Sequence, residues 1–182
     1  MVNTYDPLNQ FYMVSFKTDF GWMRPISDGN SLIRLEWNQT GWREPNRSNH
    51  VSRETKSQLE AFFNGCLQQF DLPLAPAGKS AIGRYWLNIM AKIPYGTVMS
   101  YAEFASFAGK PKGARAAGSI CASNPIPIIY PCHRVVRGDR TLGNYGGGSN
   151  YHPTHPHNLA RKAALIRLET ANYRKTIITT FH

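Results

Sequence analysis

The residues best suited to chemistry are a cysteine and a histidine that lie side by side in Pro131-Cys132-His133-Arg134-Val135. A thiol attacks an electrophile only as its thiolate, and a neighbouring base or positive charge favours that form near neutral pH. Cys66 and Cys121 are instead interpreted as inert buried thiols, the ordinary structural role of a free cysteine. We therefore predict that Cys132 is a nucleophile.

An apolar run over residues 126–130 leads into this pair, and a proline stiffens the segment just before the thiol. In extended backbone, neighbouring side chains point to opposite sides, so a direct hydrogen bond between Cys132 and His133 is not expected. A glycine-rich loop over residues 143–148 follows, and its glycines let backbone approach a ligand closely. These features predict a reactive thiol beside a binding site built from loops.

The composition is that of an ordinary globular protein, with 42% hydrophobic residues and a mean hydropathy of -0.40 over 182 residues. No apolar run approaches the roughly 20 residues that a membrane helix needs, and residues 1–16 lack the regions of a secretory signal. Three cysteines without a CxxC pair indicate neither a disulfide framework nor a zinc site. We expect a cytoplasmic protein with no membrane association, no metal and no cofactor.

The basic residues are concentrated in the part of the chain that holds the Cys-His pair. Residues 1–74 carry seven Lys/Arg and eight Asp/Glu, a net charge of −1, whereas residues 75–182 carry fourteen and three, a net charge of +11. A surface that basic attracts polyanions, of which nucleic acid is the most common. Charge alone also agrees with a purely solubilising role, and the residues leave both interpretations open.

The first half is predicted to be a small α/β domain. Residues 11–18 and 31–37 are rich in β-branched and aromatic side chains and are separated by a turn at 27–30, so both are predicted strands. Two prolines and a glycine within residues 70–79 indicate a connecting segment. We divide the chain into an α/β domain over 1–74, a linker over 75–79 and a mostly helical domain over 80–182.

Apolar spacing and capping residues predict the first two helices. Ser52 is predicted to cap a helix that stops at Asn64-Gly65 and buries the face formed by Leu59, Phe62 and Phe63. In the next helix, apolar side chains recur at i, i+3, i+4, i+7 and i+8. This spacing predicts one buried stripe, made by Ile82, Tyr85, Trp86, Ile89 and Met90.

Two short helices are predicted next, on either side of Gly109-Lys110-Pro111, in the manner of a helix-turn-helix. Ser100 and Glu103 have the spacing of a capping box for the first, and the second is expected over residues 112–122. That second helix is almost entirely small residues, which suit close approach to either a partner helix or a nucleic-acid groove. A last helix is expected over about residues 158–170.

These stretches resemble the O6-alkylguanine-DNA alkyltransferases, most closely over residues 93–148. The motifs that carry the resemblance are Ile93-Pro94-Tyr95-Gly96, Ser100-Tyr101, Gly109-Lys110-Pro111-Lys112, Ala114-Arg115-Ala116-Ala117-Gly118, Ser123-Asn124-Pro125, Pro131-Cys132-His133-Arg134-Val135, Gly143-Asn144-Tyr145-Gly146-Gly147 and Leu165-Ile166-x-Leu168-Glu169. The resemblance implies an RNase H-like α/β N-terminal domain and a C-terminal helix-turn-helix domain. It also implies a monomer that moves the alkyl group from guanine O6 in double-stranded DNA onto one cysteine and stays alkylated.

The resemblance implies a role for each residue of the reactive centre. Cys132 is implied to be the nucleophile, with a water joining it to His133 and with Glu169 orienting the imidazole. Tyr101 is implied to donate a proton to the leaving guanine and to press on the target phosphate. Asn124 is implied to tie the helix-turn-helix to the cysteine segment. From the residues alone, Glu169 would be an exposed helix carboxylate and Tyr101 a half-buried aromatic side chain.

The resemblance also implies how the damaged base is bound. Arg115 is implied to fill the gap left by a flipped nucleotide, its alternative being a generic phosphate contact. Flipping is required because a base inside the stack cannot present its O6 substituent to a protein thiol. Further DNA contacts are implied at Tyr101, Ala102, Lys110 and Gly138. The implied guanine pocket consists of Val135, Asn144, Tyr145 and Gly146, with Lys162 stabilising charge nearby.

Two features depart from the family. Residues 149–158 are about ten residues more than compact relatives have, and they hold three of the six histidines. Two prolines and the lack of a neighbouring acid or cysteine favour a solvated loop over a metal site. A lid over the pocket and a contact with DNA are two further roles that the sequence allows for this loop. Gly146 stands where some relatives have serine. Arg134 is expected to organise the cysteine loop internally.

Two other classes compete with a DNA repair alkyltransferase. One is a helix-turn-helix protein that binds alkylated DNA without chemistry, and the presence of Cys132 argues against it. The other is a thiol hydrolase with a Cys-His-Glu centre, and the charge of +11 on residues 75–182 argues against that.

Overall fold

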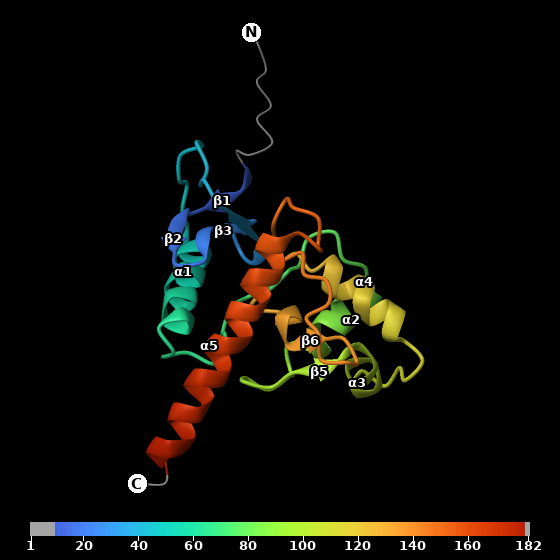
Figure 1. Ribbon diagram of the computed structural model, residues 1–182. Coiled ribbons are helices and arrows are strands. Elements are labelled where there is room, and N and C mark those ends of the chain that lie inside the picture. The colour runs from blue at the N-terminus through green and yellow to red at the C-terminus, as the bar shows by residue number, and fades with distance from the viewer. Residues whose placement is uncertain (1–9, 181–182) are drawn as a thin grey trace.

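The computed structural model describes residues 10–180, and residues 1–9 of the predicted first domain lie outside that range. A small antiparallel sheet with one helix lies beside a mostly helical C-terminal part, and the long last helix runs diagonally between them (Figure 1). Among the helices within residues 10–180, none is both long enough and apolar enough to cross a bilayer.

The sheet is built around a strand that the sequence did not indicate. Strand β3 (Gly21–Ser27) pairs antiparallel with β1 (Tyr12–Met13) and β2 (Phe16–Thr18) on one edge and with β4 (Leu32–Asn38) on the other. The strand predicted over 11–18 is therefore two short strands. The predicted turn at 27–30 is confirmed, since Asp28 Oδ1 accepts hydrogen bonds from the backbone N–H groups of Asn30 and Ser31.

Helix α1 (His50–Phe63) packs on this sheet. Its N-cap is Asn49, and Ser52 occupies the third helical position, where it completes a capping box with Asn49. The prediction that Ser52 is the cap was therefore wrong by three residues. The predicted stop is confirmed, because Asn64 caps the helix and Gly65 follows with a φ of +75°.

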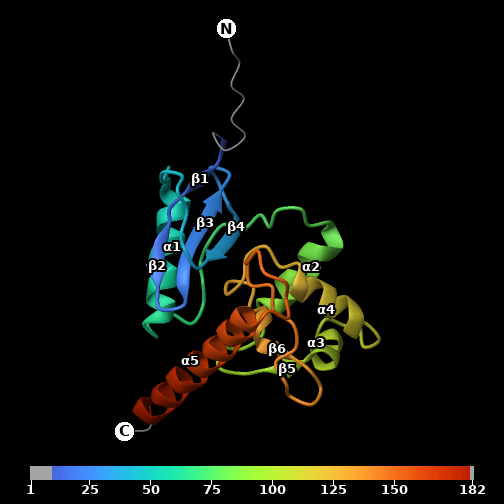
Figure 2. The same cartoon turned by 45° about the horizontal axis from the view of Figure 1, so that its top comes forward.

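The outer edge of β4 is covered by three backbone segments from later in the chain. The N–H of Leu32 donates to Pro73 O at 2.8 Å, that of Leu35 to Pro125 O at 2.9 Å and that of Trp37 to Gly148 O at 3.0 Å. Figure 2 shows β4 on the side of the sheet that faces these segments. The proline-rich segment thus runs along the sheet, and the two halves share one hydrophobic core.

Helix α2 (Ala81–Met90) buries a different face from the one predicted. Trp86 and Met90 are buried as expected, but Leu87 completes the buried face, while Ile82 is 60% and Tyr85 42% exposed. The Tyr85 hydroxyl donates to Ala108 O, so this exposed side chain joins α2 to the C-terminal end of α3 (Tyr101–Phe107).

The centre of the C-terminal part joins two helices to a short parallel strand pair. Strand β5 (Met99–Ser100) leads into α3 (Tyr101–Phe107) and pairs with β6 (Val135–Val136), while α3 packs against α4 (Ala114–Ala122). The predicted capping box of Ser100 and Glu103 is confirmed. Helix α4 begins two residues later than predicted, with Gly113 as its N-cap.

The last helix, α5 (Pro156–Thr180), begins two residues earlier and ends ten residues later than predicted. Residues 149–155 form the loop before it. His155 stacks on Tyr151 there, with ring centroids 4.2 Å apart, and His157 in the first turn of α5 stacks on His155 at 5.1 Å. Within residues 10–180, no three His, Cys, Asp or Glu side chains gather in a way that would hold a metal ion.

Candidate active site

The predicted nucleophile lies in a single 3-10 turn, η2 (Cys132–Arg134), directly before β6. The expectation of extended backbone at Cys132 was therefore wrong. The side chain of Cys132 is 1% exposed, and its Sγ accepts a hydrogen bond from Asn124 Nδ2 at 3.1 Å. The same Asn124 amide donates to Tyr130 O, and its Oδ1 accepts from the Ile126 N–H. Asn124 thus joins the end of α4 to the cysteine segment.

The turn that leads to Cys132 contains one strained residue. Ile128 has a φ of +74° although it is β-branched and buried, and the turn around it is closed by the Tyr130 N–H donating to Ile126 O. A β-branched residue in the left-handed region is a real outlier that the surrounding packing must hold in place. The backbone before the thiol is therefore fixed by its surroundings rather than by its own preference.

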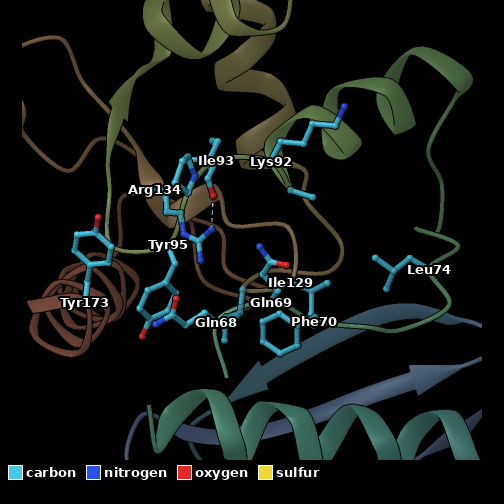
Figure 3. A pocket seen from close by; sticks show the side chains of 13 residues that line it. Gln68, Gln69, Phe70, Leu74, Lys92, Ile93, Tyr95, Ile129, Arg134 and Tyr173 are labelled. Carbon is cyan, nitrogen blue, oxygen red and sulfur yellow. Dashed lines mark hydrogen bonds between the residues drawn. The ribbon is translucent and has the colours of Figure 1, made fainter. Parts of the chain in front are cut away.

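His133, Arg134 and Glu169 form a buried network behind the thiol. Glu169 Oε1 lies 2.7 Å from His133 Nε2, and both carboxylate oxygens accept from the Arg134 guanidinium at 2.9–3.2 Å. The Gly96 N–H donates to Glu169 Oε2 at 3.1 Å. Arg134 also donates to the carbonyl of Ile93 at the wall of a cavity of about 520 Å³ (Figure 3). The expectation that Arg134 organises this loop internally is confirmed.

The charges of this network fix the tautomer of the histidine. Burial alone would raise the pKa of Glu169, but His133 and the permanent cation of Arg134 outweigh it and hold that pKa at about 2. Burial lowers the pKa of His133, so the ring is neutral at pH 7. An ionised carboxylate only accepts hydrogen bonds, so Nε2 carries the proton and Nδ1 carries the lone pair. That Nδ1 is buried and has no hydrogen-bond partner within residues 10–180.

Two groups oppose the effect of burial on the thiol. Burial raises the pKa of Cys132, while the hydrogen bond from Asn124 and the positive charge of Lys162 lower it. Lys162 is fully buried, and its Nζ donates to Val135 O at 2.6 Å and to Asn144 O at 3.3 Å. Burial lowers the pKa of Lys162 to about 8. A cation thus links the backbone of two predicted pocket residues while it favours the thiolate.

Tyr101 and Tyr145 lie close enough to Cys132 for its charge to act on the pKa of each phenol. Burial and, to a smaller extent, the charges of Cys121 and Cys132 raise the pKa of Tyr101 to about 12, although Arg137 and a backbone hydrogen bond from Asn144 act in the opposite direction. Tyr145 is 1% exposed, and its hydroxyl has no hydrogen-bond partner within residues 10–180. Both phenols are therefore protonated at neutral pH.

The glycine loop is packed tightly rather than open. Gly148 has a φ of +71°, and a Cβ there would lie 2.2 Å from Leu35 O. A Cβ on Gly146 would lie 2.9 Å from Ala122 O, so the serine of some relatives does not fit this backbone without a shift. Tight packing here places Gly146 against α4 and Gly148 against the sheet.

The predicted DNA-contacting residues are exposed except for Tyr101, which is half-buried. Arg115 shares the lining of a cavity of about 370 Å³ with Tyr101 and Asn144. The three other predicted contacts lie outside that lining, on α3, on the turn before α4 and on the loop after β6: Ala102, Lys110 and Gly138.

The thiol itself is closed off. Cys132 contributes to none of the three cavities described within residues 10–180, and the cavity beside Tyr101 and Asn144 stops short of it.

Cys66 is exposed, so its interpretation as a buried thiol was wrong, whereas that of Cys121 is confirmed. Arg137, which sequence reasoning did not single out, lines two of the cavities. Its position directly after β6 in a basic segment was the available signal.

Comparison with known proteins places this geometry in a family. Residues 84–171 match the model of the 6-O-methylguanine DNA methyltransferase, DNA binding domain. The chain is 42% identical over 122 residues to the methylated-DNA--protein-cysteine methyltransferase of Methanosarcina barkeri, covering 67% of this chain and 70% of that protein. It is 31% identical over 173 residues to the Haemophilus influenzae protein of the same name, covering 91% and 90%.

A solved structure agrees. The crystal structure of Mycobacterium tuberculosis OGT in complex with DNA matches with a TM-score of 0.72 and 31% identity, covering 89% of this chain and 93% of that one. The resemblance noted in the sequence is thus confirmed over nearly the whole chain, and the protein belongs to the methylated-DNA–protein-cysteine methyltransferase family.

Proposed function

We propose that this protein repairs double-stranded DNA by moving the alkyl group of O6-alkylguanine onto Cys132, once per molecule. The observation that carries the proposal is the buried relay in which Arg134 holds Glu169 ionised, Glu169 orients His133, and the free Nδ1 lies in the turn of the thiol. This is the arrangement of nucleophile, base and orienting acid that activates a thiol.

The transfer balances without any other reactant. The Cys132 proton passes to His133 Nδ1 through one bound water, and the thiolate attacks the alkyl carbon in line. The carbon–O6 bond breaks, the electron pair leaves on guanine O6, and Tyr101 donates a proton to that anion. With a pKa of about 12, Tyr101 holds its proton until a base of comparable strength appears. The product thioether has no bond that water hydrolyses readily, so no turnover follows.

We propose a role in DNA binding for the exposed residues around this centre. Helices α3 and α4 would form the helix-turn-helix of residues 80–182, with Arg115 entering the gap left by the flipped nucleotide. Further contacts would come from Tyr101, Ala102, Lys110 and Gly138. Small side chains on α4 support a close minor-groove approach. The solved complex of the M. tuberculosis relative with DNA supports the choice of partner.

The guanine pocket would form from Val135, Asn144, Tyr145, Gly146 and Lys162. Because Cys132 is closed off, entry of the base requires the segment around Asn144 to move away from Tyr101. We also propose that the first domain, over residues 1–74, has an RNase H-like fold. Its antiparallel strands, followed by a helix that packs on the sheet, support this proposal.

Intact mass after mixing with duplex DNA that carries O6-methylguanine tests this function. We expect one added methyl group per chain, located on the peptide that contains Cys132 and absent in Cys132→Ala. The matched control is Cys121→Ala, which removes the neighbouring buried thiol and keeps the nucleophile. DNA binding with unchanged mass would instead establish the non-catalytic alkylated-DNA binder, and multiple turnovers with released product would establish a hydrolase.

A further inference from the structure

A surface groove lies between the loop after β6 and the insertion that distinguishes this chain from compact relatives. Its volume is about 560 Å³, and its lining includes Arg137, Arg140 and Asn144 from the loop and Thr154 and Leu159 from the insertion and the start of α5. The loop after β6 therefore forms most of the groove, and the insertion adds Thr154 to its lining.

This groove continues the cavity beside the reactive centre. Arg137 and Asn144 line both, and the second cavity adds Tyr101 and Arg115. A Cβ on Gly143 would lie 3.0 Å from the Tyr101 hydroxyl and 3.3 Å from Arg137 Cγ, so the stem of Arg137 passes close to the proposed proton donor. A ligand that occupies the cavity at Tyr101 can thus extend past Arg137 into the groove.

The charges along the groove favour an anionic polymer. The guanidinium of Arg137 forms no hydrogen bond or ion pair within the described part of the chain, and that of Arg140 pairs at 2.9 Å with Glu103, where both side chains are about half exposed. Asp139 is the nearby acid, and its Oδ1 accepts from the N–H and hydroxyl of Thr141. Leu142 and Leu159 add apolar surface to the lining of the groove. Guanidinium groups beside apolar surface match the alternating phosphates and sugars of a nucleic-acid strand.

We propose that this groove binds the phosphodiester backbone of the lesion-bearing strand next to the flipped nucleotide, and that the insertion lengthens the DNA footprint through Thr154. Arg137 contacts the phosphate at the junction of the two cavities. This inference rests on the proposed function, because it takes the DNA strand to pass Tyr101.

The salt dependence of binding to undamaged duplex DNA measures the contact. Each phosphate neutralised by a cation contributes about 0.9 to the slope of log affinity against log salt. Between 50 and 200 mM salt, Arg137→Gln should therefore lose about 3.5-fold less affinity than the wild type loses. The matched control is Arg43→Gln, which removes an exposed arginine from the loop before α1 in the N-terminal part and should keep the wild-type slope. Equal slopes for wild type and Arg137→Gln would overturn the phosphate contact.

Thr154→Asp tests the insertion separately, because Thr154 lines the groove but not the cavity at Tyr101. A carboxylate there should repel the strand and weaken duplex binding at least about 3-fold at 50 mM salt, and screening should reduce the effect at 200 mM. Thr40→Asp, in the exposed turn after β4, is the control for the same substitution. Equal binding by the two variants would remove the insertion from the footprint.

The outcomes separate this inference from the proposed function. If the wild type fails to gain the methyl group but Arg137→Gln still has a reduced salt slope, DNA binding in the groove is supported and alkyl transfer to Cys132 is refuted. If the methyl group is transferred but neither substitution affects duplex binding, alkyl transfer is supported and DNA binding in the groove is refuted. For each variant, the ratio of duplex repair to reaction with free O6-benzylguanine reports DNA binding independently of the thiol.

Discussion

Replacing Glu169 by glutamine tests the relay most directly. The carboxylate is 1% exposed and accepts from His133, Arg134 and the Gly96 backbone, so Glu169→Gln removes the negative charge while keeping the size of the side chain. Lowering the pKa of Glu169 from 4.5 to about 2 corresponds to about 3 kcal/mol of folding free energy. Removing one partner of a buried charge pair costs about 3–5 kcal/mol. The two estimates agree, and we expect a loss of about 3 kcal/mol.

Denaturant unfolding across pH measures this loss and its origin. Because the folded-state pKa is below the unfolded one, the contribution is complete above about pH 5 and is lost as the pH falls toward 2. The gap in unfolding free energy between wild type and Glu169→Gln should therefore narrow by about 1 kcal/mol between pH 7 and pH 3.5. Glu60→Gln, which removes an exposed surface pair with Lys56, should change stability by less than about 0.5 kcal/mol. Parallel pH profiles for wild type and Glu169→Gln would refute the assignment of an ionised, buried Glu169.

Four further predictions follow from particular contacts. Arg115→Ala should slow repair of duplex DNA far more than reaction with free O6-benzylguanine, and equal slowing in a rapid-quench assay would contradict a role in flipping. Gly148→Ala should destabilise the fold by more than 2 kcal/mol in denaturant unfolding, because its Cβ would meet Leu35 O, whereas Gly78→Ala, with a similar φ and open space, should cost about 1 kcal/mol. Asn49→Ala should cost about 1 kcal/mol through the lost capping box, and an unchanged unfolding midpoint would argue against that cap. A thiol reagent should label exposed Cys66 first and the two buried cysteines at least 10-fold more slowly, as followed by peptide mass, and simultaneous labelling would contradict the closed site.

The sequence predicted the local elements best where side chains act on their own backbone. The capping box of Ser100 and Glu103 and the stop at Asn64-Gly65 are confirmed because each depends on residues within one turn of helix. Strand β3 was missed because it is central, with Met23 to Ser27 all buried, so it lacks the alternation typical of a strand with one solvent face, and Pro25 interrupts it.

The packing of residues that are far apart in the sequence was harder to predict. On α2 the predicted buried stripe included Tyr85, but its hydroxyl donates to Ala108 O at the surface. Apolar spacing does not distinguish a buried tyrosine from one that is exposed and hydrogen-bonded. The contact between His133 and Glu169 joins residues 36 apart, and composition or periodicity carries no signal for it. Only the family resemblance suggested that Glu169 faces the imidazole.

The covered edge of β4 has a consequence for any attempt to study the N-terminal part alone. Truncation before residue 73 would leave the N–H groups of Leu32, Leu35 and Trp37 without their acceptors and would remove part of the core that buries their side chains. An unprotected strand of that kind recruits other strands, so such a fragment would tend to form oligomers or fibrils. The repair half therefore also acts as an intramolecular guard against self-association of the sheet.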